Sequence, residues 1–418
     1  MNKTRLLIAV VAGTLWAAPG FAGSILTIDE AVLLALKHDV SLKALEQETL
    51  GWTQRSKAAD SLPDPKLKLA AMNVPTDTWE LDQSVMTQQQ IGLQQMFPSF
   101  GALDAKRDGM LAKASSASAR RSNREQELIR NVRKAWLDLY YWQEADHIIE
   151  KNKGLFAQLQ RVTELQYAAG RSNQQHVLQA SLEWSRLEDR QHQVRIQADQ
   201  ARAMLARYVG DTDSQRPLPE SCPTLPGIKL VNDIVDGLPQ HPAIREMDAM
   251  IDARKAEIDL ARAGYKPSVT IDLTYGRREG NYPDGRPLED MASAVLMLDL
   301  PLFGGRQRQE VDAGESSYSA AMLNKDDMLR MLRQQVESVN AAYRHIGMRI
   351  DNYTDNLVPQ ARANANAALR AYQSDRGQFT DLMRARVMEL ETGLQHLRLQ
   401  TDWAKAQADL IYLGGENL

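Results

Sequence analysis

Cysteine is almost absent from this 418-residue chain, which contains only Cys222. A single thiol excludes a disulfide framework, a cysteine-based zinc site and a paired-cysteine redox motif. Aromatic residues are also scarce, at 6%, whereas Ala, Leu, Gln and Arg are abundant. Such a composition favours long helices over a β-sandwich.

Excess positive charge and long hydrophobic runs are missing as well. The formal net charge is −4, from 50 basic and 54 acidic residues. This balance excludes a nucleic-acid binder held by bulk positive charge, so no nucleic-acid partner is expected. Beyond Gly23 no apolar run reaches the roughly 18 residues of a membrane-spanning helix. A periplasmic protein fits this pattern, and so does an outer-membrane β-barrel, whose short strands escape hydropathy analysis.

Residues 1–22 have the features of a secretory signal peptide. Lys3 and Arg5 precede an apolar run over Leu6–Ala18, and Gly20-Phe21-Ala22 supplies small residues for cleavage before Gly23. The apolar run is too short for an anchoring transmembrane helix. We therefore expect an exported protein.

The rest of the sequence contains two similar halves. Three segments recur in the same order, namely Leu62–Leu69 as Gly264–Ile271, Phe97–Gly101 as Leu300–Gly304, and Tyr167–Ala180 as Tyr372–Ala385. Self-similarity at a nearly constant spacing indicates an internal duplication. We assign residues 23–210 to the first repeat, the proline-rich residues 211–230 to a linker, and residues 231–418 to the second repeat.

Each repeat is expected to fold as a helix, a separate hairpin of two strands and then long helices. First helices are expected over Thr27–Asp60 and Val231–Ala263, and returning strands over Val85–Met96 and Met291–Leu300. In Ser268–Tyr275 apolar and polar residues alternate, which places four apolar side chains on one face: Val269, Ile271, Leu273 and Tyr275. Strands of roughly ten residues are long enough to cross a bilayer when tilted.

The helices after each pair of strands are expected to be unusually long. Ala102–Ala168 contains no proline, and a helix of that length extends about 100 Å. The last helix carries two parallel apolar seams, which indicates two helical neighbours and a closed ring of helices. Four strands cannot close a barrel, so their edges predict an oligomer; three copies would supply twelve strands.

With these features the sequence resembles the TolC-like outer-membrane efflux family along essentially the whole mature chain. Similarity to its cation-efflux branch (CzcC- and CusC-like) rests on Leu62–Leu67, Asn73–Pro75 and Met86–Pro98. The resemblance implies a mainly α protomer with a small β part, which as a homotrimer forms a twelve-stranded transmembrane β-barrel on a periplasmic α-helical barrel. It also implies outer-membrane lipid, a periplasmic adaptor protein and an inner-membrane resistance-nodulation-division pump as partners, with heavy-metal cations as cargo.

Other functions stay open at this point. Drug efflux and type I secretion would use the same architecture, and a periplasmic coiled-coil scaffold without a pore belongs to a different class. A scaffold has no need for an exposed apolar strand face. If that face meets lipid, Ile271→Arg should be costly, whereas Asp272 on the other face is expected to tolerate arginine.

Catalysis is not expected from this sequence. Its seven histidines form no HExxH motif, and Gly304-Gly305-Arg306 lacks the Lys-Ser/Thr of a phosphate loop. Methionine pairs such as Met247 with Met250 are interpreted as helix packing rather than as a copper site. We therefore expect no cofactor and no resident metal.

The tight turns between the long helices are the main candidate site. They contain Gly170 and Arg171 in the first repeat, and Asp375, Arg376 and Gly377 in the second. The resemblance implies that these turns form the periplasmic tip, where the tunnel narrows and the adaptor docks.

The resemblance also places aperture residues at His176 and Asp381. For Asp381 two interpretations are open, a ring of three carboxylates that attracts cations or an acid favoured at a helix start; for His176 a structural role is favoured. Arg171 and Arg376 occupy equivalent positions and are expected to tether the turns to acids on neighbouring helices.

Overall fold

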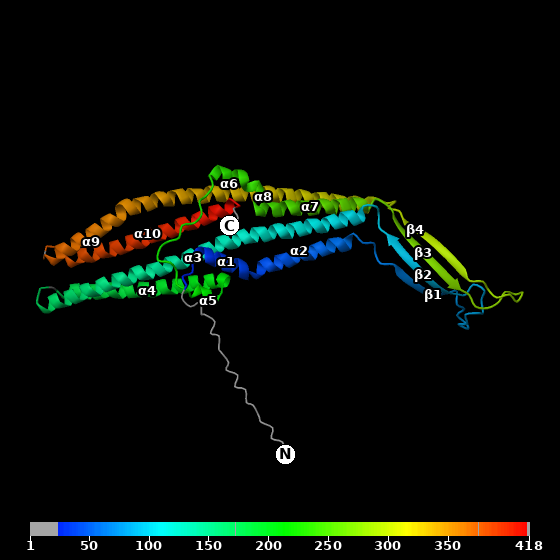
Figure 1. Ribbon diagram of the computed structural model, residues 1–418, viewed down its shortest axis with the longest axis horizontal. Coiled ribbons are helices and arrows are strands. Elements are labelled where there is room, and N and C mark those ends of the chain that lie inside the picture. The colour runs from blue at the N-terminus through cyan, green and yellow to red at the C-terminus, as the bar shows by residue number, and fades with distance from the viewer. Residues whose placement is uncertain (1–23, 172, 375, 416–418) are drawn as a thin grey trace, which may run out of the picture. The chain divides into compact units, whose positions relative to one another are not determined.

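The computed structural model describes residues 24–171, 173–374 and 376–415 (Figure 1). The expected signal peptide, residues 1–22, lies outside these described residues. Two compact units make up the described chain. The sheet unit contains Leu36–Asn131, Leu225–Arg349 and the residues from Asp402 on, and the turn unit contains the residues up to Ala35, Val132–Thr224 and Ile350–Thr401. Nowhere in the described ranges does a helix combine the length and apolar character needed to span a membrane.

The elements follow the expected order in both halves. The first half forms α1 (Ile28–His38), α2 (Val40–Ala59), β1 (Lys66–Met72), β2 (Gln88–Phe97), α3 (Ala102–Ala168), α4 (Gln174–Val209) and α5 (Asp211–Ser214). The second half forms α6 (Val231–Gly237), the 3₁₀ turn η1 (Leu238–Gln240), α7 (Pro242–Ala263), β3 (Ser268–Arg277), β4 (Met291–Asp299), α8 (Gly305–Asn352), the π-helical turn η2 (Tyr353–Leu357), α9 (Val358–Gln373) and α10 (Phe379–Leu413). The expectation of a mostly helical chain with a small sheet is confirmed, and α3 has the bounds that its lack of proline predicts.

The first helix of each half was expected to be continuous, and this prediction was wrong in both. Asp39 separates α1 from α2, because its extended backbone ends one helix and its Oδ1 accepts a hydrogen bond from the Leu42 backbone N–H at 2.8 Å. His241 caps α7 in the same way, with Nδ1 accepting from the Ala243 N–H at 3.3 Å and Pro242 at the first helical position. The sequence repeat therefore preserves a helix break.

The four strands form one antiparallel sheet in the order β1-β2-β3-β4 (Figure 1). Two separate hairpins were expected, but β2 pairs with β3 over nine residue pairs, from Gln89 with Arg277 to Phe97 with Val269. This pairing joins the two halves of the chain. It leaves β1 and β4 as edge strands of the described sheet, each paired on one side only.

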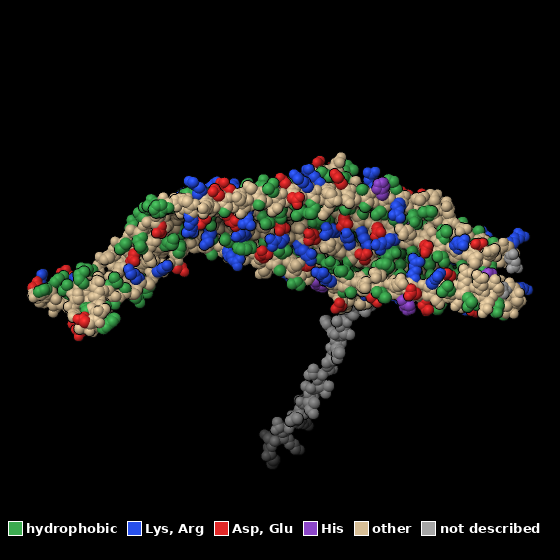
Figure 2. All heavy atoms as spheres, turned by 180° about the vertical axis from the view of Figure 1, so that it is seen from behind, with side chains coloured by type: hydrophobic (Ala, Val, Ile, Leu, Met, Phe, Trp, Pro, Cys, Tyr) green, Lys and Arg blue, Asp and Glu red, His purple; other side chains and the backbone are tan. Residues whose placement is uncertain are grey.

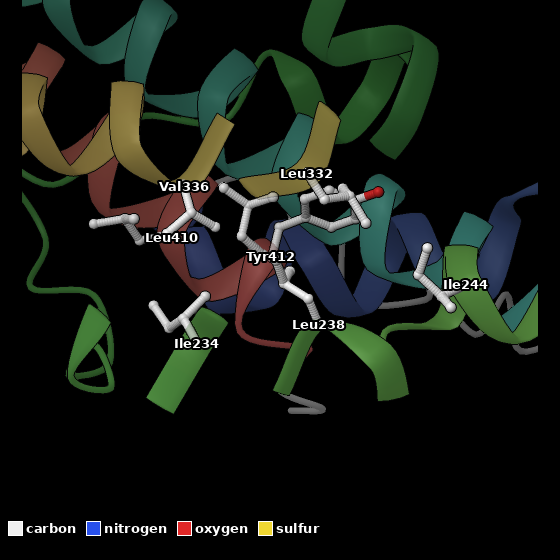
Figure 3. Packing of buried hydrophobic residues seen from close by; sticks show 8 residues of the cluster. Ile234, Leu238, Ile244, Leu332, Val336, Leu410 and Tyr412 are labelled. Atoms are coloured by element: carbon white, nitrogen blue, oxygen red, sulfur yellow. The ribbon is translucent and has the colours of Figure 1, made fainter. Parts of the chain in front are cut away.

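A hydrophobic cluster joins four helices of the sheet unit, α6, α7, α8 and α10, and the η1 turn. Figure 3 shows Leu332 and Val336 of α8 packed with Leu410 and Tyr412 of α10, and Leu238 is fully buried below them. His241 Nε2 lies 3.1 Å from the Tyr412 carbonyl oxygen, and the two rings meet edge to face at 5.0 Å. Burial lowers the pKa of His241, so its neutral form is favoured in the folded chain.

The turn unit has its own core around a buried tryptophan. Trp136 is completely buried, donates Nε1–H to the Leu26 carbonyl oxygen at 3.0 Å, and stacks on Tyr140 at 5.6 Å. Burial raises the pKa of Tyr140 to about 12. Arg216, in the segment expected to be a linker, binds both carboxylate oxygens of Glu30 at 2.8 and 2.9 Å. That bidentate pair anchors the linker to α1.

A π-helical turn interrupts the helical path of the second half. It spans Tyr353–Leu357, directly before α9 and Pro359. Proline cannot donate its i−4 hydrogen bond and clashes with the preceding turn, which accounts for the local widening. His396 of α10 faces this turn, with Nε2 at 3.1 Å from the Thr354 hydroxyl and its ring parallel to that of Tyr353. In the first half α3 has no such break.

Candidate functional site

One face of the sheet is apolar and exposed. Because side chains alternate along a strand, the strand pairing aligns two rows across all four strands: Leu67, Leu93, Leu273 and Ala294, and Leu69, Ile91, Tyr275 and Ala292. Of the predicted face, Ile271 is 37% exposed, Leu273 54% and Tyr275 49%, while Val269 is half-buried. On the face drawn in Figure 2, charged side chains are dense over the helices and sparse over the sheet. An exposed apolar surface of this kind marks a site of contact with a membrane, a protein or a ligand.

The opposite face of the sheet carries the polar side chains of β1, β2 and β3, several of which bond to one another, together with Val295 and Met297 of β4. Lys68 Nζ of β1 reaches across β2 to Asp272 Oδ2 of β3 at 3.5 Å, and the Thr274 hydroxyl donates to Asp272 Oδ1 at 2.7 Å. Gly92 lies between Lys68 and Thr274 in the strand pairing, and a Cβ there would stand 2.6 Å from the Thr274 hydroxyl oxygen. Because Gly92 has no side chain, the Lys68 side chain can cross β2 and reach Asp272.

Asp272 does not meet the expectation placed on it. Arginine was expected to be tolerated at this position on the other face, but the residue is only 7% exposed and its carboxylate is paired with Lys68. Replacing Asp272 with arginine would place a second positive charge beside Lys68. Gln90, on the same face between Ala70 and Gly276, has small neighbours and is the better position for a charged control.

The first helix–helix turn is built around Gly170. Its backbone φ is +70°, a conformation that favours glycine. The Arg171 N–H donates to the Gln166 carbonyl at 2.8 Å and the Gly170 N–H to the Tyr167 carbonyl at 2.9 Å, which is the Schellman pattern of a helix end. Asn173 then caps α4 by accepting from the His176 N–H at 3.1 Å.

The second turn is closed by backbone contacts to Ala371. The N–H groups of Arg376 and Gly377 both donate to the Ala371 carbonyl, at 2.9 and 3.1 Å. A Cβ on Gly377 would lie 2.9 Å from the Ala371 side chain, so the turn is tight enough to require glycine. Asp375, a predicted member of this site, lies outside the described residues.

Side chains connect the two turns within the turn unit. The Tyr372 hydroxyl of α9 donates to Gln166 Oε1 of α3 at 2.6 Å. The His176 ring of α4 lies 5.5 Å from the ring of Phe379, which begins α10, is completely buried and also contacts Tyr372 at 5.6 Å. These contacts join helices of the first repeat to helices of the second.

The two predicted arginine tethers are not seen within the chain. Among the residues that the structure describes, no acidic side chain lies within ion-pair distance of Arg171 or Arg376. Asp381 lies in the first turn of α10, where the helix dipole favours an acid. Its carboxylate remains 62% exposed and 3.9 Å from Arg384, so both interpretations of this residue remain compatible with its position.

Sequence reasoning missed the pair that connects the turns most directly. Tyr372 belongs to the repeated segment and to the second turn, but the repeat gives it no partner, and Phe379 has no aromatic counterpart, since Gln174 stands at the equivalent place in the first half. An aromatic residue directly after a helix–helix turn, with no counterpart in the other half, could have indicated a packing contact at Phe379. Within the described ranges no group of three or more His, Cys, Asp or Glu side chains is arranged to hold a metal ion.

Comparison with known proteins identifies the family. The profile described as "Outer membrane efflux protein" matches residues 32–211 and 234–416, which together make up most of the chain. The chain therefore belongs to the outer membrane efflux protein family. Members of this family are outer-membrane transport channels rather than enzymes, which confirms the expected class and location.

Individual relatives agree with this assignment. Nodulation protein T of Rhizobium leguminosarum bv. viciae is 27% identical over 279 residues, covering 64% of this chain and 55% of that protein. The structure of CusC, described in connection with transmembrane channel formation, has a TM-score of 0.78 at 17% identity over 100% of this chain and 99% of that one. The outer membrane protein VceC from Vibrio cholerae has a TM-score of 0.77 at 18% identity over 93% and 96%. The chain thus spans about half the length of its curated relative and shares its fold with the two solved proteins.

Proposed function

We propose that three copies of this chain form an outer-membrane channel that serves as the exit duct of a tripartite efflux system. The observation that carries the proposal is the sheet: one face is apolar and exposed, the other carries the bonded polar side chains, and β1 and β4 each pair on one side only among the described strands. In lipid every backbone N–H and C=O group needs a partner, so open edges must pair with further copies. Three four-stranded sheets then close one twelve-stranded barrel with lipid outside and water inside.

The two-repeat organisation is part of the proposal. Residues 23–210 and 231–418 act as homologous halves joined by residues 211–230, a division supported by the two family segments 32–211 and 234–416. Among the described residues the halves differ in two features, since the π-helical turn and Phe379 both belong to the second half.

The helix–helix turns are proposed as the periplasmic end of the duct. Gly170, Arg171, Arg376 and Gly377 would meet a periplasmic adaptor protein that couples the duct to an inner-membrane resistance-nodulation-division pump. His176 and Asp381 would lie at the aperture. The contacts of Tyr372 with Gln166 and of Phe379 with His176 support this role, since a resting duct must be held closed by bonds that can rearrange.

Heavy-metal cations are the proposed cargo, on the strength of the sequence resemblance to the cation-efflux branch. Drug efflux is the second candidate, because a duct of the same architecture would serve either cargo. Deleting the gene and measuring growth against zinc, cobalt, cadmium, copper and a panel of antibiotics tests this. Sensitivity to metals alone, restored by the intact gene, is expected; sensitivity to antibiotics alone would contradict the metal cargo.

A further inference from the structure

The two edge strands of the sheet carry opposite charges. β1 (KLKLAAM) contains Lys66 and Lys68 and no acid, whereas β4 (MASAVLMLD) contains Asp299 and no basic residue. All nine residues of β4 are exposed, and among the described strands β4 pairs with β3 alone, which leaves its other edge unpaired. An exposed strand edge is a template for pairing with another strand.

Lys66 and Asp299 lie on the same face of the sheet. Lys66 pairs with Gln94 and thus shares a row with Asp272, and Asp299 pairs with Ser268. Because side chains alternate along each strand, both residues belong to the polar face. They also lie at the same end, since β1 starts at Lys66 soon after α2 and β4 ends at Asp299 shortly before α8.

Neither charge is neutralised within its own copy. Lys68 has Asp272 as its partner at 3.5 Å, but no acid reaches Lys66 among the residues described. Asp299 accepts a hydrogen bond from the Ser268 hydroxyl at 2.7 Å, and no basic side chain of the described chain lies within ion-pair distance of it. One edge therefore presents an unpaired cation and the other an unpaired anion.

We propose that β4 of one copy pairs with β1 of the next copy and that the Lys66 ammonium group binds the Asp299 carboxylate across this seam. The inference rests on the proposed trimer and specifies how its copies join. Copies inserted in the same direction bring β4 and β1 together antiparallel, with Lys66 and Asp299 at the same end of the seam. A head-to-tail contact of this kind closes a ring.

The alternation of side chains limits the register of the seam. A shift by one residue would turn the polar side chains of one strand toward lipid, so permitted registers differ by steps of two. These permitted registers include the ones in which Lys66 lies directly opposite Asp299 or diagonal to it, and a lysine side chain spans either separation. The ion pair favours these registers over shifts that leave both charges unpaired.

Charge reversal and its rescue test the seam. We expect Asp299→Lys and Lys66→Asp each to reduce the trimer fraction measured by native mass spectrometry in detergent. A like-charged cross-strand pair lowers the pairing constant up to about five-fold, and three seams multiply to about a hundred-fold. The double variant, in which the charges are exchanged, should recover trimers close to the wild-type fraction.

The outcomes separate this inference from the function on which it rests. A wild-type chain that forms no trimer contradicts the proposed channel. A wild-type trimer with single variants that assemble equally well, or with a double variant no better than the poorer single one, overturns only the seam. Rescue by exchange also excludes a general folding defect, which a second substitution would worsen.

Chemical cross-linking supplies a second measurement. In a Cys222→Ala background, the variant with both Lys66→Cys and Asp299→Cys should form covalent links between chains when treated with a bifunctional thiol-reactive cross-linker that spans about 8 Å. Leu67→Cys with Asp299→Cys is the matched control, because Leu67 lies on the apolar face. Covalent trimers from the first pair alone support the seam; equal linking in both pairs, or in neither, overturns it.

Discussion

Placing a charge on the apolar face of the sheet should prevent stable insertion into a membrane. Leu273 lies near the middle of β3, is 54% exposed, and is aligned with Leu93 and Ala294 on the neighbouring strands. An arginine at the midplane of a barrel costs about 2–4 kcal/mol. Even the lower value shifts the folding equilibrium about 30-fold in each copy, and the substitution occurs once in every copy.

The matched control for Leu273→Arg is Gln90→Arg. Gln90 lies on the polar face between Ala70 and Gly276, so a longer side chain has room and faces water. Urea titration in lipid vesicles, followed by the heat-modifiable mobility of the folded protein, would compare the two variants. We expect Leu273→Arg to lose stability and Gln90→Arg to stay within about 0.5 kcal/mol of wild type. Equal losses, or none in either variant, would refute the assignment of the apolar face to lipid.

Three further predictions concern the helical part. Tyr372→Phe removes the hydroxyl that binds Gln166, so it should lower the free energy of unfolding by about 1 kcal/mol and raise the open probability of the channel in planar bilayers. Tyr167 occupies the equivalent position in the first half but is exposed, so Tyr167→Phe should change neither quantity. Burial lowers the pKa of His241, so as the pH falls its imidazole is protonated near pH 6.5 in the unfolded chain before it is protonated in the folded chain. The free energy of unfolding should therefore decrease as the pH drops below about 6.5. A free energy of unfolding that does not change over this pH range would contradict the prediction. Asp381→Asn should lower cation-over-anion permeability at low salt and have little effect near 1 M salt, where charges are screened within about 3 Å; equal reversal potentials at low salt would leave Asp381 as a helix-start residue.

The strand faces were predictable because they follow from local alternation. Ser268–Tyr275 alternates without interruption, and three of its four apolar side chains are exposed as expected. The pairing of β2 with β3 was not predictable, because it joins segments almost half a chain apart and nothing local fixes that register. The same limit applies to Asp272, whose burial depends on Lys68 reaching across an intervening strand.

Helix boundaries were predictable only where no side chain competes with the backbone. The full length of α3 was predictable because this segment contains no proline. Asp39 and His241 ended helices by accepting backbone hydrogen bonds, and a periodic apolar pattern does not reveal such caps. The turn at Gly170 was predictable because glycine favours the positive φ that it adopts there. The contact between Tyr372 and Gln166 was not predictable, because it joins two helices from different repeats.

Single-channel recording from the purified, detergent-extracted protein in a planar lipid bilayer tests the central claim most directly. If three copies close one barrel over a helical duct, the wild-type protein should produce discrete, uniform conductance steps, and Leu273→Arg should produce none. A protein that yields no steps, or irregular ones unaffected by Leu273→Arg, would contradict the channel and favour a periplasmic scaffold.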